Sequence, residues 1–214
     1  HRIENIQGTT TELLIQKSPL YEELNDPEKA LNVMFDAFEI DSLNVNVLHR
    51  IVSLLLDKEE NEKAILYNQL IIDHFPDDPR GFINNAVIAL SGKKPEEAIL
   101  ALSPHLDRFS QDFTMQYLLG TAYYQFKDYG NATIHLSQAL AIFPESRNTK
   151  HNLALIYDTT GEWDRSDKLY MELISTDSTD AQAFNNYAYS LVERGEDVEF
   201  ALELAMNAIR LAPK

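Results

Sequence analysis

The chain has 214 residues, 44% of them hydrophobic and 24% charged, which is an ordinary composition for a folded globular protein. Its formal net charge of −16 argues against nucleic-acid binding, because contacts with phosphate groups need clustered lysine and arginine. The sequence holds no cysteine, which excludes disulfides and cysteine metal sites, and no apolar run near the roughly 20 residues that span a bilayer.

The compartment and the limits of the full protein stay open at this stage. The sequence shows no targeting segment, and a chain without cysteine suits the cytoplasm and the periplasm alike. Its start at His1 and Arg2 suggests a trimmed chain, and we expect it to be one segment of a larger bacterial protein. Two interpretations of the acidity remain: a solvated outer face that keeps the protein dispersed, or attraction of a basic partner.

Small residues recur along the chain with a period of 34 positions. One phase of this period is occupied by Ala30, Ala64, Ala98, Ala132, Ser166 and, after one inserted residue, Ala201. Prolines fall on multiples of the same period, at Pro76, Pro144 and, with the same shift, Pro213. This spacing is typical of an array of helical hairpins, which presents a surface to a partner rather than a catalytic pocket.

Counting in steps of 34 divides the chain into a lead-in, residues 1–10, and a single solenoid domain, residues 11–214. Each repeat is expected to form two antiparallel helices and to pack only on its neighbours, which predicts an all-α body. The predicted repeats are 11–44, 45–78, 79–112, 113–146, 147–180 and 181–214.

Two prolines disturb the first and third of these repeats. Pro19 lies within the first helix of repeat 11–44 and should kink or shorten it, because proline cannot donate a helical hydrogen bond. Pro104 lies within the second helix of repeat 79–112 and should bend or break it. Neither proline shifts the register of the next repeat.

Repeat 113–146 carries the pattern most clearly. Gly120 and Ala132 have side chains small enough for two helices to approach closely. Large residues, among them Leu119 and Tyr123, fill the space on either side. A polar turn separates the two predicted helices.

This pattern resembles the tetratricopeptide repeat, in which a bulky residue, Leu-Gly, Tyr, Ala, a large apolar residue, Ala and Pro recur every 34 residues. The residues that carry the match best are Leu119, Gly120, Tyr123, Ala132, Leu136, Ala139 and Pro144. The last repeat matches through Phe184, Tyr187, Ala188, Leu191, Ala201, Ala205, Ala208 and Pro213. The resemblance implies a right-handed superhelical solenoid of antiparallel helix pairs, whose concave surface is lined by the first helix of each repeat.

No motif for catalysis, a cofactor or a metal is present in the sequence. The six histidines never take the i, i+4 spacing of a helical zinc site, and the seven glycines form no phosphate-binding loop. Ser103 and His105 place a hydroxyl near an imidazole, but nothing supplies an oxyanion hole. The sequence therefore predicts a protein that is not an enzyme and that needs no cofactor or metal.

The resemblance implies that defined positions of each first helix line a peptide-binding groove. Three repeats hold asparagine at one of these positions, and asparagine can both donate to and accept from the backbone of an extended peptide. Tyrosines at neighbouring positions would add rigid contact area. The predicted groove residues are Arg50, Asn84, Tyr117, Tyr124, His151, Asn152, Asn186 and Tyr189.

The alternative is that the asparagines bond between neighbouring helices and that the tyrosines are packing residues. The carboxylate clamp of chaperone-adaptor members of the family is incomplete here. No repeat has lysine at the fifth position or asparagine at the ninth, so recognition of acidic chaperone tails is disfavoured.

Three functions are compatible with such an array. We favour a non-enzymatic scaffold that binds an extended peptide or partner protein in the groove, without nucleic-acid binding or membrane insertion. The second is a structural module that forms homo-oligomers through its last repeat, which stops at Pro213 and Lys214 without a polar capping helix. The third is a regulatory appendage of a larger enzyme.

Overall fold

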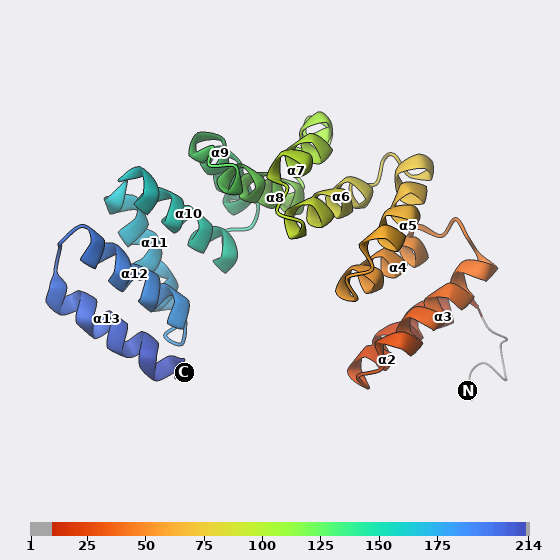
Figure 1. Ribbon diagram of the computed structural model, residues 1–214, viewed down its shortest axis with the longest axis horizontal. Coiled ribbons are helices and arrows are strands. Elements are labelled where there is room, and N and C mark those ends of the chain that lie inside the picture. The colour runs from red at the N-terminus through yellow and green to blue at the C-terminus, as the bar shows by residue number, and fades with distance from the viewer. Residues whose placement is uncertain (1–9, 213–214) are drawn as a thin grey trace. The chain divides into compact units, whose positions relative to one another are not determined.

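The computed structural model describes residues 10–212, and within this range every regular element is a helix (Figure 1). Residues 1–9 of the expected lead-in, and the terminal Pro213 and Lys214, lie outside the described residues. The described chain divides into two compact units, one ending at Pro104 and the other beginning at His105. A single solenoid domain over residues 11–214 therefore stays a prediction.

The first unit is a run of helical hairpins. Its helices are α2 (Thr11–Glu23), α3 (Pro27–Ile40), α4 (Val45–Asp57), α5 (Asn61–His74), α6 (Arg80–Ser91) and α7 (Pro95–Leu102). Within this unit each helix packs on the next one along the chain (Figure 1). α4 also packs on both α2 and α6. Ala30, Ala64 and Ala98 are fully buried, which explains why this unit needs a small residue once in every repeat.

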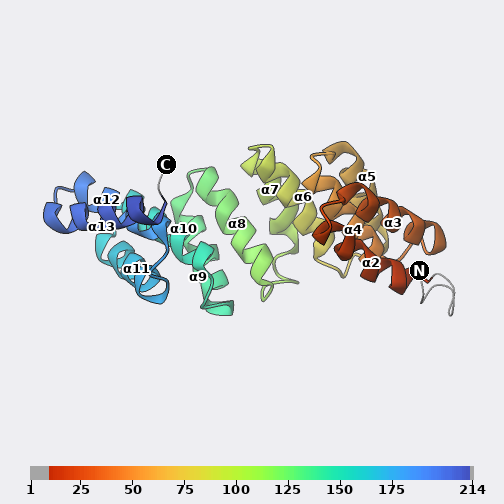
Figure 2. The same ribbon diagram turned by 90° about the horizontal axis from the view of Figure 1, so that it is seen from below.

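The second unit repeats the same arrangement. Its helices are α8 (Phe113–Gln125), α9 (Tyr129–Ile142), α10 (Arg147–Thr160), α11 (Trp163–Thr176), α12 (Ala181–Glu193) and α13 (Val198–Leu211). Successive helices again pack on one another, and α10 also packs on both α8 and α12 (Figure 2). The first helices of neighbouring repeats therefore lie in contact and form a shared surface within this unit.

Acidic and hydroxyl side chains begin most of these helices by capping free backbone N–H groups. Asp112 Oδ1 accepts from Met115 N at 2.9 Å at the start of α8, and Asp180 Oδ1 accepts from Ala183 N at 3.0 Å at the start of α12. A negative charge at a helix N-terminus is also favoured by the helix dipole. Part of the acidity of the chain therefore serves to define where helices begin.

Gly120 allows α8 and α9 to approach closely, as the sequence pattern predicts. A Cβ atom at this position would lie 2.6 Å from Cγ of Leu136 and 3.0 Å from its backbone nitrogen. Ala132 is fully buried beside it, and the ring of Tyr123 stacks on His135 with 5.5 Å between centroids. The small residues set the spacing of the two helices, and the aromatic rings fill the flanks.

The two prolines differ in their effect. α2 runs from Thr11 to Glu23 with Pro19 inside it, so of the two expected effects, a kink or a shortening, the shortening does not occur. Pro19 lies on the exposed side of α2, where water can satisfy the carbonyl group that loses its helical donor. Pro104 behaves as predicted, because α7 ends at Leu102 and a 3₁₀ turn follows.

Candidate partner-binding site

The predicted groove residues are divided between the two compact units. The first unit holds Arg50 on α4 and Asn84 on α6. The second unit holds the other six, on α8, α10 and α12. Within residues 10–212 no group of histidine, aspartate and glutamate side chains is arranged to hold a metal ion. None of the helices in that range combines the length and apolar character needed to cross a bilayer.

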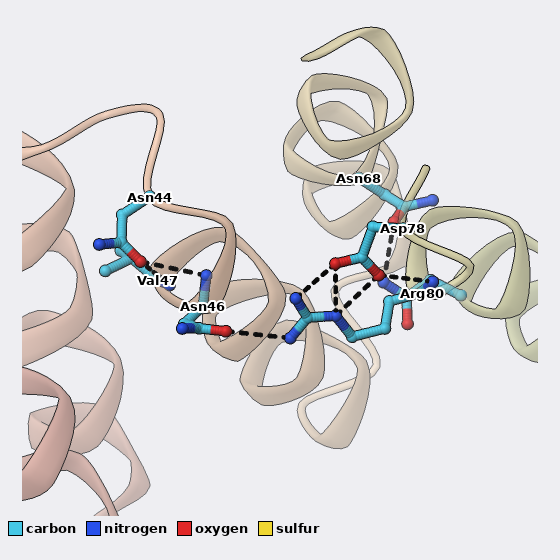
Figure 3. A network of polar contacts seen from close by, with 7 residues as sticks. Asn44, Asn46, Val47, Asn68, Asp78 and Arg80 are labelled. Atoms are coloured by element: carbon cyan, nitrogen blue, oxygen red, sulfur yellow. Dashed lines mark hydrogen bonds and ion pairs between the residues drawn. The ribbon is translucent and has the colours of Figure 1, made fainter. Parts of the chain in front are cut away.

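In the first unit, polar side chains join α4 to the start of α6 (Figure 3). Nε of Arg80 donates to Asp78 Oδ1 at 2.9 Å, and its Nη1 donates to Asn46 Oδ1 at 3.1 Å. The hydrogen bonds from Arg80 lower the pKa of Asp78 below its usual range. Arg50 on α4 forms an ion pair with Glu22 of α2. These charged groups are therefore occupied by contacts between repeats.

Asn84 is bound into the interior of the first unit. Its side chain is 6% exposed, and its Nδ2 donates to Oδ1 of Asn68 on α5 at 2.8 Å. Asn68 in turn donates to the carbonyl of Gly81 and to Oδ1 of Asn85, each at 2.8 Å. This geometry matches the alternative interpretation, in which an asparagine at the shared position bonds between neighbouring helices. Sequence reasoning missed Asn68, whose only signal is a polar residue on an apolar helix face.

In the second unit, the asparagines at the same position are more accessible. Asn152 is half-buried, and its Nδ2 lies 3.4 Å from the hydroxyl oxygen of Tyr117, which is a long hydrogen bond between α10 and α8. Asn186 is also half-buried and accepts from Asn185 Nδ2 at 3.5 Å. Bonds this long are weak and readily exchanged for contacts with a ligand.

The other predicted groove residues of the second unit differ in accessibility. Tyr124 is half-buried, and burial raises its pKa above the usual range. His151 is 5% exposed, and its Nε2 lies 2.9 Å from Oδ2 of Asp180, which also pairs with Arg147. Tyr189 is 63% exposed. The structure thus brings Tyr117 and Asn152 together, leaves Tyr189 open and holds His151 in the interior.

A cleft of about 500 Å³ opens between α10, α11 and α12, and we call it the α10–α12 cleft. Its lining residues are Asp158, Thr159, Trp163, Tyr189, Ser190, Glu193 and Arg194. Tyr189 was a predicted groove residue, whereas Trp163, Ser190 and Arg194 were not. The available signal for Trp163 is that it is the single tryptophan of the chain. It is 46% exposed, so this large ring remains accessible at the cleft.

The walls of the α10–α12 cleft are held by contacts between repeats. Asp158 on α10 accepts from the hydroxyl of Tyr170 on α11 and from that of Ser190 on α12, each at 2.8 Å. Arg194 has a side chain only 4% exposed, and its Nη2 donates to both carboxylate oxygens of Asp167 at 2.8 and 2.7 Å. The guanidinium carbon lies 5.9 Å from the ring centroid of Trp163. Residues from three helices therefore fix the shape of this cleft.

Comparison with known proteins supports the repeat assignment from sequence and from fold. The family model described as Tetratricopeptide repeat matches residues 94–147. A search of curated proteins finds no match.

Three solved structures illustrate the similarity of the fold. A chain of the Cut9–Hcn1 hetero-tetramer of the APC/C superposes with a TM-score of 0.84 at 13% identity, over 100% of this chain and 42% of that one. PilF of Pseudomonas aeruginosa gives 0.81 at 16% identity, over 95% and 92%. YrrB, described as a TPR protein with an unusual peptide-binding site, gives 0.68 at 17% identity, over 85% and 93%. The chain thus spans less than half the length of the first of these.

Proteins of this fold generally mediate protein–protein interactions through the extended surfaces that stacked repeats provide. Three observations indicate an array of repeated helix pairs: the periodic small residues, the packing of successive helices and the matched family model. Residues 94–147 of this chain match the tetratricopeptide repeat, and its fold of stacked helix pairs is similar to that of solved proteins with such repeats.

Proposed function

We propose that this chain is a non-enzymatic scaffold that binds an extended peptide or partner segment on the surface shared by α8, α10 and α12. The carrying observation is that this surface combines accessible polar and aromatic groups with the α10–α12 cleft. The residues that we assign to it are Tyr117, Tyr124, Asn152, Asn186 and Tyr189.

Two features support an extended ligand at this surface. Among the residues that the structure describes, the amides of Asn152 and Asn186 make only long hydrogen bonds, so they can exchange these for bonds to a peptide backbone. The exposed ring of Tyr189 offers rigid contact area with a hydroxyl at its tip. The similarity to YrrB supports the same class of ligand. Asn84 is excluded from this surface, because its amide is buried and already bonded.

The proposal is tested with a double variant, Asn152→Ala with Asn186→Ala. Random-sequence peptides displayed on phage are selected against the full chain, and the affinities of the enriched peptides are measured by calorimetry. We expect roughly tenfold weaker binding by the double variant, with a melting temperature within about 2 °C of the parent, since neither amide is strongly bonded in the free protein.

Asn84→Ala provides the contrasting control, because it removes a buried hydrogen bond. We expect it to lower the melting temperature clearly. The proposal fails if no peptide is enriched, or if the double variant loses stability as Asn84→Ala does while peptide affinity stays unchanged.

A second candidate function is self-association through α13, and one observation favours it. Val198, Leu202, Met206 and Ile209 are each more than 60% exposed and share one face of this helix. Such an apolar stripe can bury itself against a second copy of the chain. Light scattering at increasing protein concentration should then show oligomers that Leu202→Glu abolishes. A chain that stays monomeric at all concentrations excludes this candidate.

A further inference from the structure

We infer that the α10–α12 cleft is a pocket for a basic side chain, lysine or arginine, carried by the bound partner segment. The chemical basis is the juxtaposition of two carboxylates, Asp158 and Glu193, with the rings of Trp163 and Tyr189. This inference rests on the proposed function and specifies which chemistry the partner brings to that surface.

The two rings form accessible aromatic walls. Trp163 is 46% exposed and Tyr189 is 63% exposed, whereas tryptophan and tyrosine usually bury most of their large apolar surface. A cation over the face of tryptophan or tyrosine is attracted by the ring quadrupole, most strongly in the case of tryptophan. The apolar stem of a lysine or arginine side chain can pack on the same rings while its charged end reaches the carboxylates.

The two carboxylates have no cationic partner among the described residues. Asp158 is half-buried, and within residues 10–212 its carboxylate accepts only from the hydroxyl groups of Tyr170 and Ser190. Glu193 accepts a hydrogen bond from the hydroxyl of Tyr189, which raises the pKa of that tyrosine. Hydroxyl donors stabilise a carboxylate without neutralising it. The charge at the cleft is therefore available to an incoming cation.

The one cationic side chain in the lining is already neutralised. Arg194 is bound to both oxygens of Asp167, and its Nε lies 3.1 Å from Glu196. Its Nη1 is buried without an acceptor among the described residues. Arg194 therefore does not oppose a cationic ligand.

The charge of the whole chain acts in the same direction. A net charge of −16 attracts basic segments over distances longer than the contacts themselves. Of the two interpretations of the acidity, a basic partner is the one that the α10–α12 cleft favours.

The inference is tested with the same selection of random-sequence phage-displayed peptides against the full chain. We expect lysine and arginine to be enriched among the selected peptides. Trp163 is the only tryptophan, so its fluorescence reports occupancy of the cleft directly. A selected peptide should change this fluorescence, and its counterpart with norleucine in place of the basic residue should bind roughly fivefold or more weakly, as loss of an ion pair predicts.

Glu193→Gln is the test variant, because Glu193 is exposed and its removal leaves the interior intact. We expect it to weaken binding of the basic peptide roughly fivefold and to leave the norleucine peptide unaffected. Glu203→Gln, which removes one charge from an exposed position on α13, should change neither affinity.

The possible outcomes separate this inference from the proposed function. If peptides are selected and depend on Asn152 and Asn186 but show no basic preference, the pocket is overturned and the scaffold stands. An equal loss of affinity in Glu193→Gln and Glu203→Gln would also overturn the pocket, because only the overall charge would then matter. If no peptide is enriched, both proposals fail.

Discussion

Gly120 lies at a close contact between α8 and α9, and a larger side chain cannot be added there unless Leu136 or its helix moves. Its virtual Cβ meets Leu136 Cγ at 2.6 Å and the backbone nitrogen of the same residue at 3.0 Å. We expect Gly120→Ala to lower the free energy of unfolding by about 1–3 kcal/mol, the usual cost of overpacking. Chemical denaturation measures this change.

Gly130→Ala is the matched control, because it lies in the first turn of α9 with no atom closer than 3.7 Å to its virtual Cβ. Alanine has the higher helix propensity, so we expect a gain of about 0.5–1 kcal/mol. A destabilisation of similar size in both variants would show that the close approach at Gly120 is not the cause.

The burial of His135 makes the stability of the fold depend on pH. Burial lowers its pKa below the usual range, while its Nδ1 donates to Gln116 Oε1 at 2.9 Å. The unfolded chain therefore takes up a proton near pH 6.5, where the folded chain does not yet do so. Stability is fully present above that pH, and we expect it to fall as the pH is lowered from about 7 to about 5.

Denaturation curves across this range measure the effect. His135→Gln should flatten the dependence on pH without removing it, because burial also lowers the pKa of His49. An unchanged slope in His135→Gln would refute the assignment to His135.

The asparagines show the limit of inference from residue position. Asn84, Asn152 and Asn186 occupy the same position of their repeats, and the sequence gives no reason to treat them differently. Asn84 is buried and donates to Asn68 on the facing helix, whereas the hydrogen bonds that the other two amides make within the described residues are long. The identity of the facing residue therefore decides whether a shared position is structural or accessible.

Among the helices, the clearest local determinant is the N-cap. Asp128 begins α9, and its Oδ1 accepts from Asn131 N at 3.1 Å. Asp128→Ala should therefore lower the free energy of unfolding by about 1 kcal/mol. Glu162 holds the N-cap position of α11 but makes no capping hydrogen bond. Glu162→Ala should consequently cost less than half as much in the same denaturation assay, and equal losses would contradict a specific capping role.

Helix type and order were predictable because the period, the turn residues and the caps are local signals. The prolines were less so. Pro19 and Pro104 both lack the backbone N–H that a helix interior requires. Nevertheless α2 continues past Pro19, whereas α7 ends before Pro104. A proline on an exposed helix side leaves its orphaned carbonyl to water, and exposure of a helix side depends on tertiary packing.

Within each compact unit, a substitution that destabilises one helix pair should also destabilise the neighbouring pairs. The reason is that each helix pair packs on the pairs next to it along the chain. Within the second unit, Gly120→Ala should therefore reduce amide hydrogen-exchange protection most in α8 and α9. The loss should be smaller in α10 and α11 and smallest in α12 and α13. A uniform loss over all six helices would instead show that this unit unfolds in one cooperative step.

The sequence by itself determined that this chain is an all-α array of repeated helix pairs. Each hairpin brings together residues near in sequence, such as Gly120 and Leu136, and the same small residue is needed once in every repeat. Only the tertiary structure decided which side chains remain open to a partner. The α10–α12 cleft depends on contacts between residues far apart in sequence, Ser190 with Asp158 and Arg194 with Asp167, and no periodic pattern encodes these pairs. Burial and hydrogen bonding depend on neighbours in space, and a position within a repeat does not specify them.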